Sequence, residues 1–314
     1  MKAIFITQHG DSTVLRLRET ETPIPSGQEV MVRVTAIGIN YADILVREGV
    51  YPIGPLPAIA GAEVTGIIES VGNDVHDLKP GQKVSGVAQH GYAAYALLQV
   101  SQVFPVPDEI PSEQALIFQA LTACHLLEQT NGYQSLLITA AAGGIGSMVV
   151  QLAKSRGIPL IIGMTGNNKK MEYIRSMGAT HAISFQDDQW ASVLQEITAR
   201  KGVDLVLDAV GGPIGASLIH QLAPGGKMVV FGSSSGVPTT INAQDLIWKS
   251  NSVTGATIYA ASMKQKQQWA KEIFQKIMQG SIRQKTSSFP LSAAAEAQDL
   301  LKSRSVTGRI VLMP

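Results

Sequence analysis

From residue 135 onward, short apolar segments alternate with segments of helical periodicity, and this alternation restricts the chain to few folds. The apolar segments are nearly continuous runs of Val, Ile, Leu and Met, which is typical of parallel strands covered by helices on both faces. Six such strands predict a doubly wound α/β sheet of the Rossmann type. The predicted strands are 135–139, 160–164, 181–185, 203–209, 227–231 and 252–258, and the predicted helices are 145–155, 170–177, 189–200 and 213–221.

The chain before residue 110 has a different pattern. Its β-branched segments are separated by Gly and Pro turns such as Lys79-Pro80-Gly81, which predicts an antiparallel, mostly β domain. We expect residues 1–122 and 260–314 to form this domain and residues 123–259 to form the α/β domain. The closing strand need not belong to the six-stranded sheet. The predicted elements outside the α/β domain are strands 2–7, 29–39, 64–71, 82–88, 92–100 and 309–313, and helices 264–279 and 292–301.

Charge and cysteine content exclude several classes of partner and site. Lys and Arg number 25 against 24 Asp and Glu, a net charge of +1, so no basic excess is present to bind nucleic acid or an anionic membrane. The single cysteine, Cys124, excludes an internal disulfide and any zinc site that needs two thiolates. The N-terminal segment lacks the apolar stretch of a signal peptide, and we find no membrane span. We therefore expect a cytoplasmic protein.

The most informative motif is the glycine-rich turn between the first predicted α/β strand and its helix. Gly143, Gly144, Ile145 and Gly146 follow the strand and open the helix, which is the context that a dinucleotide-binding turn requires. Small residues let the backbone N–H groups and the positive end of the helix dipole approach a pyrophosphate. Ala141 occupies the first position of the glycine motif, so the match is a variant. The alternative is that these glycines only permit close packing of strand and helix.

The end of the second α/β strand predicts which dinucleotide is bound. A site for NAD normally places a carboxylate there to bind the ribose 2′-hydroxyl, and residues 162–170 contain none. Thr165, Asn167 and Lys170 can instead donate hydrogen bonds or positive charge to a 2′-phosphate. These residues favour NADPH as the cofactor. The alternative for Lys169 and Lys170 is a solvated start of a helix.

Together these motifs resemble a known family. The chain resembles zinc-independent medium-chain dehydrogenase/reductases of the NADPH:quinone oxidoreductase and ζ-crystallin branch. The resemblance implies a GroES-like β domain, a Rossmann nucleotide-binding domain and an active site in the cleft between them. Zinc-dependent relatives have a Cys ligand at the position of Asn40 and a His ligand at that of Ala62, so no metal is expected. The segments that carry the resemblance are 38–43, 49–52, 61–66, 71–72, 79–81, 121–123, 140–146, 208–212, 231–236 and 307–312.

The resemblance also implies roles for individual residues. It places Asn40 and Tyr51 as hydrogen-bond donors to the substrate oxygen. Among the cofactor-binding residues, it places Thr122 beside the nicotinamide carboxamide, Gly144 and Ile145 on the pyrophosphate, Gly166 and Lys170 near the 2′-phosphate, and Phe231 and Ser233 beside the nicotinamide ribose, with Val210 in the same set. Two residues depart from the family pattern, because Leu45 and Phe185 stand where several relatives have tyrosines.

The expected activity is metal-independent transfer of hydride from NADPH to a quinone or an α,β-unsaturated carbonyl, small molecules whose conjugation spreads the developing charge. Two alternatives remain: an enoyl-thioester reductase, and a nucleotide-binding sensor or structural protein with little turnover. The family also implies a homodimer.

Several residues have a plainer interpretation as well. Tyr51 could be a packed aromatic, Asn40 could cap a helix that begins at Tyr41, and Asp43 and Glu63 are expected to be structural hydrogen-bond acceptors.

Overall fold

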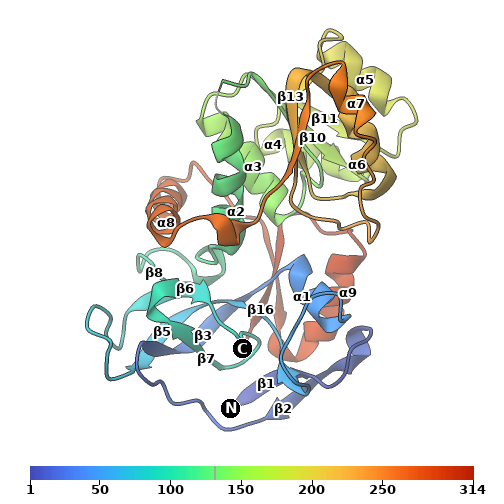
Figure 1. The fold of residues 1–314 in the computed structure, drawn as a ribbon. Helices are drawn as coiled ribbons and strands as arrows, with labels where there is room; N and C mark the ends of the chain where they lie inside the picture. Colours follow the sequence, from blue (N-terminus) through green and yellow to red (C-terminus); the bar gives the residue numbers. More distant parts are fainter. Residues whose placement is uncertain (131) are drawn as a thin grey trace. The chain divides into compact units, whose positions relative to one another are not determined.

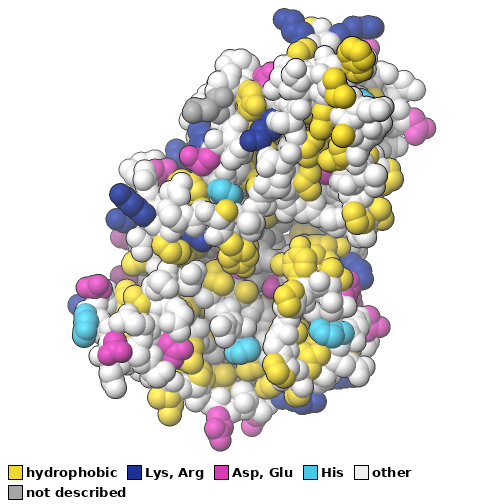
Figure 2. Space-filling view, viewed as in Figure 1, with side chains coloured by type: hydrophobic (Ala, Val, Ile, Leu, Met, Phe, Trp, Pro, Cys, Tyr) yellow, Lys and Arg dark blue, Asp and Glu magenta, His cyan; other side chains and the backbone are white. Residues whose placement is uncertain are grey.

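The protein is described by a computed structural model, which covers residues 1–130 and 132–314. The chain divides into two compact units, one formed by Met1–Phe118 with Met263–Pro314 and the other by Gln119–Ser262. We call them the β unit and the α/β unit. On the face in Figure 2, cationic and anionic side chains are interspersed, in keeping with the small net charge. In the described residues, no helix has the length and apolar character needed to cross a bilayer.

The α/β unit contains the predicted six-stranded sheet, and all of its strand pairs are parallel. The strand order is β11-β10-β9-β12-β13-β14, which is the doubly wound order. Its strands are β9 (Ser135–Ile138), β10 (Leu160–Thr165), β11 (His181–Ser184), β12 (Val203–Asp208), β13 (Leu222–Val230) and β14 (Ser252–Gly255). Its helices are α2 (Phe118–Leu127), α3 (Gly144–Ser155), α4 (Met171–Ser176), α5 (Trp190–Ile197), α6 (Gly212–Leu218) and α7 (Gln244–Ile247), with α2 beginning one residue before the unit.

The β unit is built on a seven-stranded sheet of order β15-β16-β3-β5-β6-β8, in which β7 also pairs with β3. A smaller sheet joins β2, β1 and β4. The strands are β1 (Lys2–Ile6), β2 (Leu15–Glu19), β3 (Glu29–Ile39), β4 (Ala58–Ile59), β5 (Glu63–Val71), β6 (Lys83–Val87), β7 (Tyr95–Gln99), β8 (Val103–Pro105), β15 (Thr286–Pro290) and β16 (Arg309–Met313), and the helices are α1 (Tyr41–Arg47), α8 (Met263–Met278) and α9 (Ala294–Lys302).

The closing strand β16 lies between β15 and β3 in this sheet, so the end of the chain pairs with a strand from its beginning (Figure 1). The sequence did not require this strand to belong to the six-stranded sheet, and it lies in the sheet of the β unit. Strands β2, β4, β8 and β15 were not predicted. The predicted strand at 252–258 is shorter than expected, because β14 ends at Gly255 and a 3-10 helix forms over Ile258–Ala260.

The register of the large sheet positions a group of polar residues. Strand β3 is central, and it pairs antiparallel with both β5 and β16. Gly38 near the end of β3 faces Glu63 at the start of β5, and Ile39 faces Ile310 of β16. The start of β5, the start of β16 and the residue that follows β3 therefore meet at one edge of the sheet.

Candidate functional site

The glycine-rich turn lies between β9 and α3, as the sequence predicts. Gly143 is the N-cap of α3, with extended backbone angles (φ −81°, ψ 179°), and α3 continues for 12 residues. Gly144, Ile145 and Gly146 form the first turn of this helix, where backbone N–H groups lack partners within the helix. The turn is tied to the neighbouring strand, because Ala141 N–H donates to the carbonyl of Met164 in β10 at 3.0 Å. This arrangement has the polarity and the donors that bind a phosphate group.

The packing alternative for the glycines applies to Gly146 and, through the side chain of Gln119, to Gly144, but not to Gly143. A Cβ atom on Gly146 would lie 2.4 Å from the carbonyl oxygen of Ala140 and 2.7 Å from Cα of Ala141, so close packing requires glycine there. A Cβ on Gly143 would have a single near neighbour, at 3.3 Å. Packing therefore explains Gly146, whereas Gly143 is not required by packing and remains consistent with close approach of a ligand.

Gln119 of α2 is a neighbour of the turn that the sequence did not reveal. A Cβ on Gly144 would lie 1.9 Å from Oε1 of Gln119, so the amide of Gln119 lies directly against the first residue of α3. Thr122 follows on the same helix, three residues later, and both side chains are buried. The structure therefore presents two polar residues of α2 on one face of that helix, of which only Thr122 was predicted.

The residues at and after the end of β10 form a partly buried polar segment. Thr165 at the end of the strand is buried, and its hydroxyl accepts from the N–H of Asn167 at 3.3 Å. Asn167 caps the next turn by accepting from the N–H of Lys169 at 3.0 Å. Lys170 is 8 % exposed, and burial lowers its pKa. The solvated alternative thus holds for Lys169, which is exposed, and not for Lys170.

Phe185 lies against this segment. A Cβ on Gly166 would lie 2.6 Å from Cζ of Phe185, so Gly166 is needed to accommodate the ring. A tyrosine at this position would carry its hydroxyl on that same Cζ atom. Phe185 offers no hydrogen bond from this place.

The ends of β12 and β13 are joined by a buried network around Asp208. Its carboxylate accepts from the hydroxyl of Thr139 at 2.8 Å and from the N–H groups of Val210 and Gly211 at 3.0 and 3.1 Å. Phe231 N–H donates to the carbonyl of Asp208 at 2.9 Å, which fixes the loop after β13 against the loop after β12. These bonds position Val210 and Phe231, two of the predicted cofactor residues, at adjacent strand ends.

Ser233 lies farther along the loop after β13, where its hydroxyl donates to the carbonyl of Val237 at 2.9 Å. The predicted residues of the α/β unit therefore follow the carboxyl ends of β9, β10, β12 and β13, which are consecutive in the sheet, and the helix α2. In doubly wound sheets, ligands bind at this edge.

In the β unit, Asn40 is the N-cap of α1, and its plainer interpretation as a helix cap is therefore correct. Its side-chain nitrogen also donates to Oε2 of Glu63 at 3.0 Å. The same carboxylate oxygen accepts from Nη2 of Arg309 at 2.7 Å, and the other oxygen accepts from the N–H of Phe118 at 2.8 Å. Glu63 and Arg309 are both buried. Glu63 is thus the structural acceptor that the sequence suggested, and one of its donors is a predicted site residue.

Asp43 fixes the start of α1 from the other side. Its Oδ2 accepts from the N–H of Asn40 at 2.9 Å and from the hydroxyl of Tyr92 at 3.0 Å. Burial raises the pKa of Asp43 from 3.8 to about 7, because desolvation opposes the charged form more than these hydrogen bonds favour it. Burial also raises the pKa of Tyr92 well above its ordinary value.

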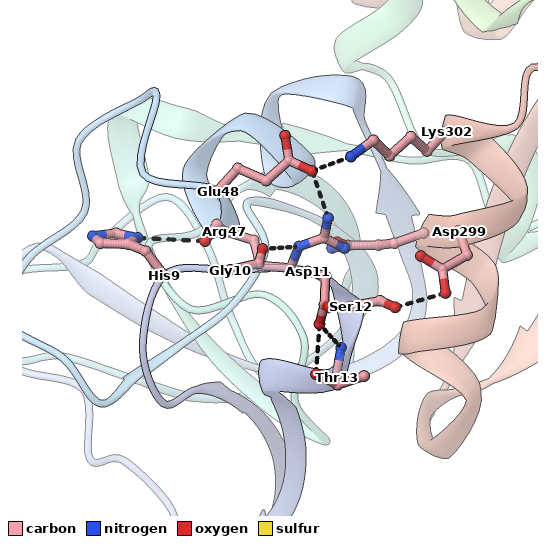
Figure 3. A network of polar contacts seen from close by, with 10 residues as sticks. His9, Gly10, Asp11, Ser12, Thr13, Arg47, Glu48, Asp299 and Lys302 are labelled. Atoms are coloured by element: carbon pink, nitrogen blue, oxygen red, sulfur yellow. Dashed lines mark hydrogen bonds and ion pairs between the residues drawn. The ribbon is translucent and has the colours of Figure 1, made fainter.

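The other end of α1 is held by a second network, drawn in Figure 3. The buried guanidinium of Arg47 donates to the carbonyl of Gly10 at 3.1 Å and to Glu48 at 2.8 Å. Lys302 of α9 binds the same Glu48 oxygen at 2.6 Å. Both ends of the short helix that follows Asn40 are therefore anchored by side chains.

Tyr51 lies beyond α1 in a loop and is 46 % exposed. It is therefore not the packed aromatic of its alternative interpretation. Its N–H donates to the carbonyl of Leu45 at 3.1 Å, which holds the loop to the end of α1.

Comparisons with known proteins agree with this architecture. Residues 26–108 match the alcohol dehydrogenase GroES-like domain, and residues 144–276 match the zinc-binding dehydrogenase family. A quinone oxidoreductase of Pseudomonas aeruginosa is 35 % identical over 325 residues, covering 100 % of this chain and 99 % of that protein. The chain belongs to the quinone oxidoreductase family. Quinone oxidoreductase 1 of Escherichia coli (strain K12) is 32 % identical over 98 % of each chain.

Solved structures of this quinone oxidoreductase family have the same fold. The crystal structure of the Escherichia coli quinone oxidoreductase complexed with NADPH superposes with a TM-score of 0.94 at 31 % identity and covers 100 % of both chains. A quinone oxidoreductase of Pseudomonas syringae has a TM-score of 0.93 at 32 % identity, covering 100 % of this chain and 99 % of that one. The predicted fold of a GroES-like domain with a Rossmann-type sheet is confirmed, as is the expectation of a quinone-oxidoreductase-like enzyme.

The name of the matching dehydrogenase family implies a zinc ion, but the residues at the expected ligand positions of this chain cannot bind one. The Asn40 amide nitrogen is a donor that binds Glu63, and Ala62 has no ligand atom. Within residues 1–130 and 132–314, no three His, Cys, Asp or Glu side chains are grouped so that they could hold a metal ion.

Proposed function

We propose that the protein transfers a hydride from NADPH to a quinone or an α,β-unsaturated carbonyl. NADPH supplies the hydride, solvent supplies a proton, and the products are NADP⁺ and the reduced acceptor. The similarity over the whole chain to quinone oxidoreductases, one of them solved with NADPH, is the observation that supports this proposal most strongly.

The residues of the α/β unit fit the cofactor. Backbone N–H groups of Gly143 to Gly146 would hold the pyrophosphate at the start of α3. Lys170 and the polar groups of Thr165, Gly166 and Asn167 would bind the 2′-phosphate, and the segment contains no carboxylate to repel it. Thr122, Val210, Phe231 and Ser233 would line the nicotinamide and its ribose.

Two donors of the β unit fit the substrate. Negative charge develops on the carbonyl oxygen as the hydride arrives, and a positioned donor stabilises that charge. The Nδ2 group of Asn40 and the hydroxyl of the exposed residue Tyr51 would supply these donors. Neither is asked to remove a proton, so no general base is required.

The test follows NADPH absorbance with 1,4-benzoquinone, 9,10-phenanthrenequinone, an alkenal and crotonyl-CoA. Oxidation with a quinone or the alkenal is the expected result. Oxidation with crotonyl-CoA alone would instead identify an enoyl-thioester reductase, and binding of NADPH without oxidation by any acceptor would identify a sensor or structural protein.

The cofactor assignment has a separate test in Lys170→Glu. A carboxylate at this position repels a 2′-phosphate and leaves a 2′-hydroxyl acceptable. The variant should raise KM for NADPH at least tenfold while KM for NADH changes little, which corresponds to about 1.4 kcal/mol or more of lost binding. An unchanged ratio of the two KM values would contradict the assignment.

We also propose that the protein is a cytoplasmic homodimer, paired through the α/β units. Strand β14 is an edge of the parallel sheet, and Trp248 beside α7 is 92 % exposed. An unpaired strand edge and an exposed aromatic that precedes it in the sequence are features of a suitable pairing surface. Sedimentation of the protein and of Trp248→Glu tests this, since a dimer that uses this surface should dissociate in the variant.

A further inference from the structure

We propose that Glu63, held in place by Arg309, is a positioning residue that fixes the orientation of the Asn40 side-chain amide. The inference rests on the proposed function, in which the nitrogen of that amide donates to the substrate oxygen. An amide can turn by 180° and exchange its nitrogen for its oxygen, which would replace a donor by an acceptor. A carboxylate only accepts, so it stabilises one of the two orientations.

The strand register explains why these three residues meet. Asn40 directly follows β3, Glu63 begins β5 and Arg309 begins β16, and both of those strands run antiparallel to β3. Gly38 leaves the space for the side chains. A Cβ on Gly38 would lie 2.2 Å from Oε2 of Glu63 and 2.6 Å from Nη2 of Arg309. The ion pair therefore lies directly over the strand that leads to Asn40.

The carboxylate of Glu63 is itself rigidly held. Phe118 N–H and Arg309 Nη2 bind its two oxygens, while Nη1 of Arg309 donates to the carbonyl of Leu116 at 2.8 Å and to Gln284 at 3.1 Å. Glu63 cannot turn away from Asn40 without breaking these buried bonds.

Stability alone does not account for the ion pair. Two buried charges are costly to desolvate, and packed apolar side chains of similar volume often give equal or greater stability. The ion pair instead holds the Glu63 carboxylate, which can only accept hydrogen bonds, in a fixed position beside Asn40. The proposed reaction uses the side-chain nitrogen of Asn40 as a donor. That property matters for chemistry rather than for packing.

The test is a double-mutant cycle of Glu63→Gln and Asn40→Ala, with quinone reduction and NADPH binding as readouts. Glu63→Gln should lower kcat about tenfold or more, because a misplaced donor loses much of its effect on the transition state. Calorimetry should give an unchanged Kd for NADPH. In the Asn40→Ala background, the same substitution should change kcat less than about twofold, because the amide it positions is absent.

Glu63→Gln leaves the charge of Arg309 buried without a counter-ion and could unfold the β unit. The paired variant Glu63→Gln/Arg309→Met removes both charges and should keep a thermal midpoint close to that of the wild type. It should nonetheless show the loss in kcat. Lys302→Ala is the matched control, since it removes an exposed ion pair at the other end of α1 (Figure 3) and should leave kcat unchanged.

The outcomes separate this inference from the proposed function. If the wild type oxidises NADPH with none of the acceptors, or if Asn40→Ala is as active as the wild type, the proposed role of Asn40 fails and the inference fails with it. If Asn40→Ala is slow while the paired variant retains full kcat, only the positioning role is overturned. Effects of Glu63→Gln and Asn40→Ala that multiply in the double mutant would also overturn it.

Discussion

The two units prepare their candidate site residues in opposite ways. In the α/β unit, the candidate phosphate-binding cradle, residues 143–146, consists of backbone N–H groups and small residues in one continuous turn. The other candidate residues follow the carboxyl ends of neighbouring strands. In the β unit, the polar residues are side chains brought together by strand register, with the partly buried Asn40 bonded to the buried ion pair of Glu63 and Arg309. Substitutions should therefore act through local geometry in the first unit and through burial and charge in the second.

The largest effect on stability is expected for Arg47→Met in the β unit. Arg47 is buried and donates to Gly10, Gln298 and Glu48 at 3.1, 2.9 and 2.8 Å. Removing it leaves buried acceptors without donors, and the free energy of unfolding should fall by about 3–5 kcal/mol. Urea denaturation measures the change.

The control for Arg47→Met is Lys302→Ala, which removes the other cation on Glu48. The side chain of Lys302 is half exposed. Exposed ion pairs contribute at most about 1 kcal/mol, so the loss should be small. Equal losses for the two variants would show that burial does not distinguish the two ion pairs.

A pH-dependent effect is expected at Asp43. The pKa of the unfolded carboxyl is near 3.8 and that of the folded carboxyl is about 7, because burial opposes the charge. Between these values the folded state binds more protons than the unfolded state, so this group lowers stability as pH rises, by up to about 4 kcal/mol above pH 7. Asp43→Asn cannot ionise and still offers an oxygen to Asn40 N–H and Tyr92.

The measurement for Asp43→Asn is the free energy of unfolding of both proteins from pH 4 to pH 8. The variant should gain stability relative to the wild type as pH rises through this range. A difference that stays constant with pH would mean that Asp43 is ionised in the folded protein throughout.

A smaller effect is expected in the glycine-rich turn, where Gly146→Ala is compared with Gly143→Ala. The Cβ of the first variant would meet the backbone oxygen of Ala140 at 2.4 Å, which forces a shift of strand or helix. We expect a loss of about 1–3 kcal/mol, as for other overpacked sites. The Cβ of the second variant would have its nearest neighbour at 3.3 Å. Thermal denaturation of the two variants should therefore give clearly different midpoints, and equal midpoints would contradict the assignment of Gly146 to packing.

The same contrast explains which parts of the molecule could be predicted from the sequence. The cradle was predicted because a strand, a turn and a helix are consecutive and leave a local signature. Glu63 and Arg309 are 246 residues apart, and no local pattern indicates that they meet. Gln119 was missed because its contact with Gly144 depends on how α2 packs, and β15 was missed because it pairs with β16 at the edge of a sheet. Contacts set by strand register and helix packing depend on the whole fold. The local periodicity of a sequence carries no information about them.

The smallest effect is expected for Phe185→Tyr. This variant tests whether a side-chain hydroxyl can strengthen binding of the cofactor in the α/β unit. Cζ of Phe185 is the ring atom closest to where a Cβ on Gly166 would lie, and a tyrosine hydroxyl would be attached to that atom. If Gly166 and Lys170 border the 2′-phosphate as proposed, the hydroxyl adds one donor to an anion. A hydrogen bond contributes about 0.5–1.5 kcal/mol net, and one to a charged group contributes up to about 3 kcal/mol, so Kd for NADPH should fall by about twofold or more. NADH lacks the phosphate, and its Kd should not change.

Calorimetry with both cofactors measures the two values. Equal shifts for NADPH and NADH would mean that the ring contacts a part of the dinucleotide that the two share, and the 2′-phosphate would then have to lie elsewhere than beside Gly166.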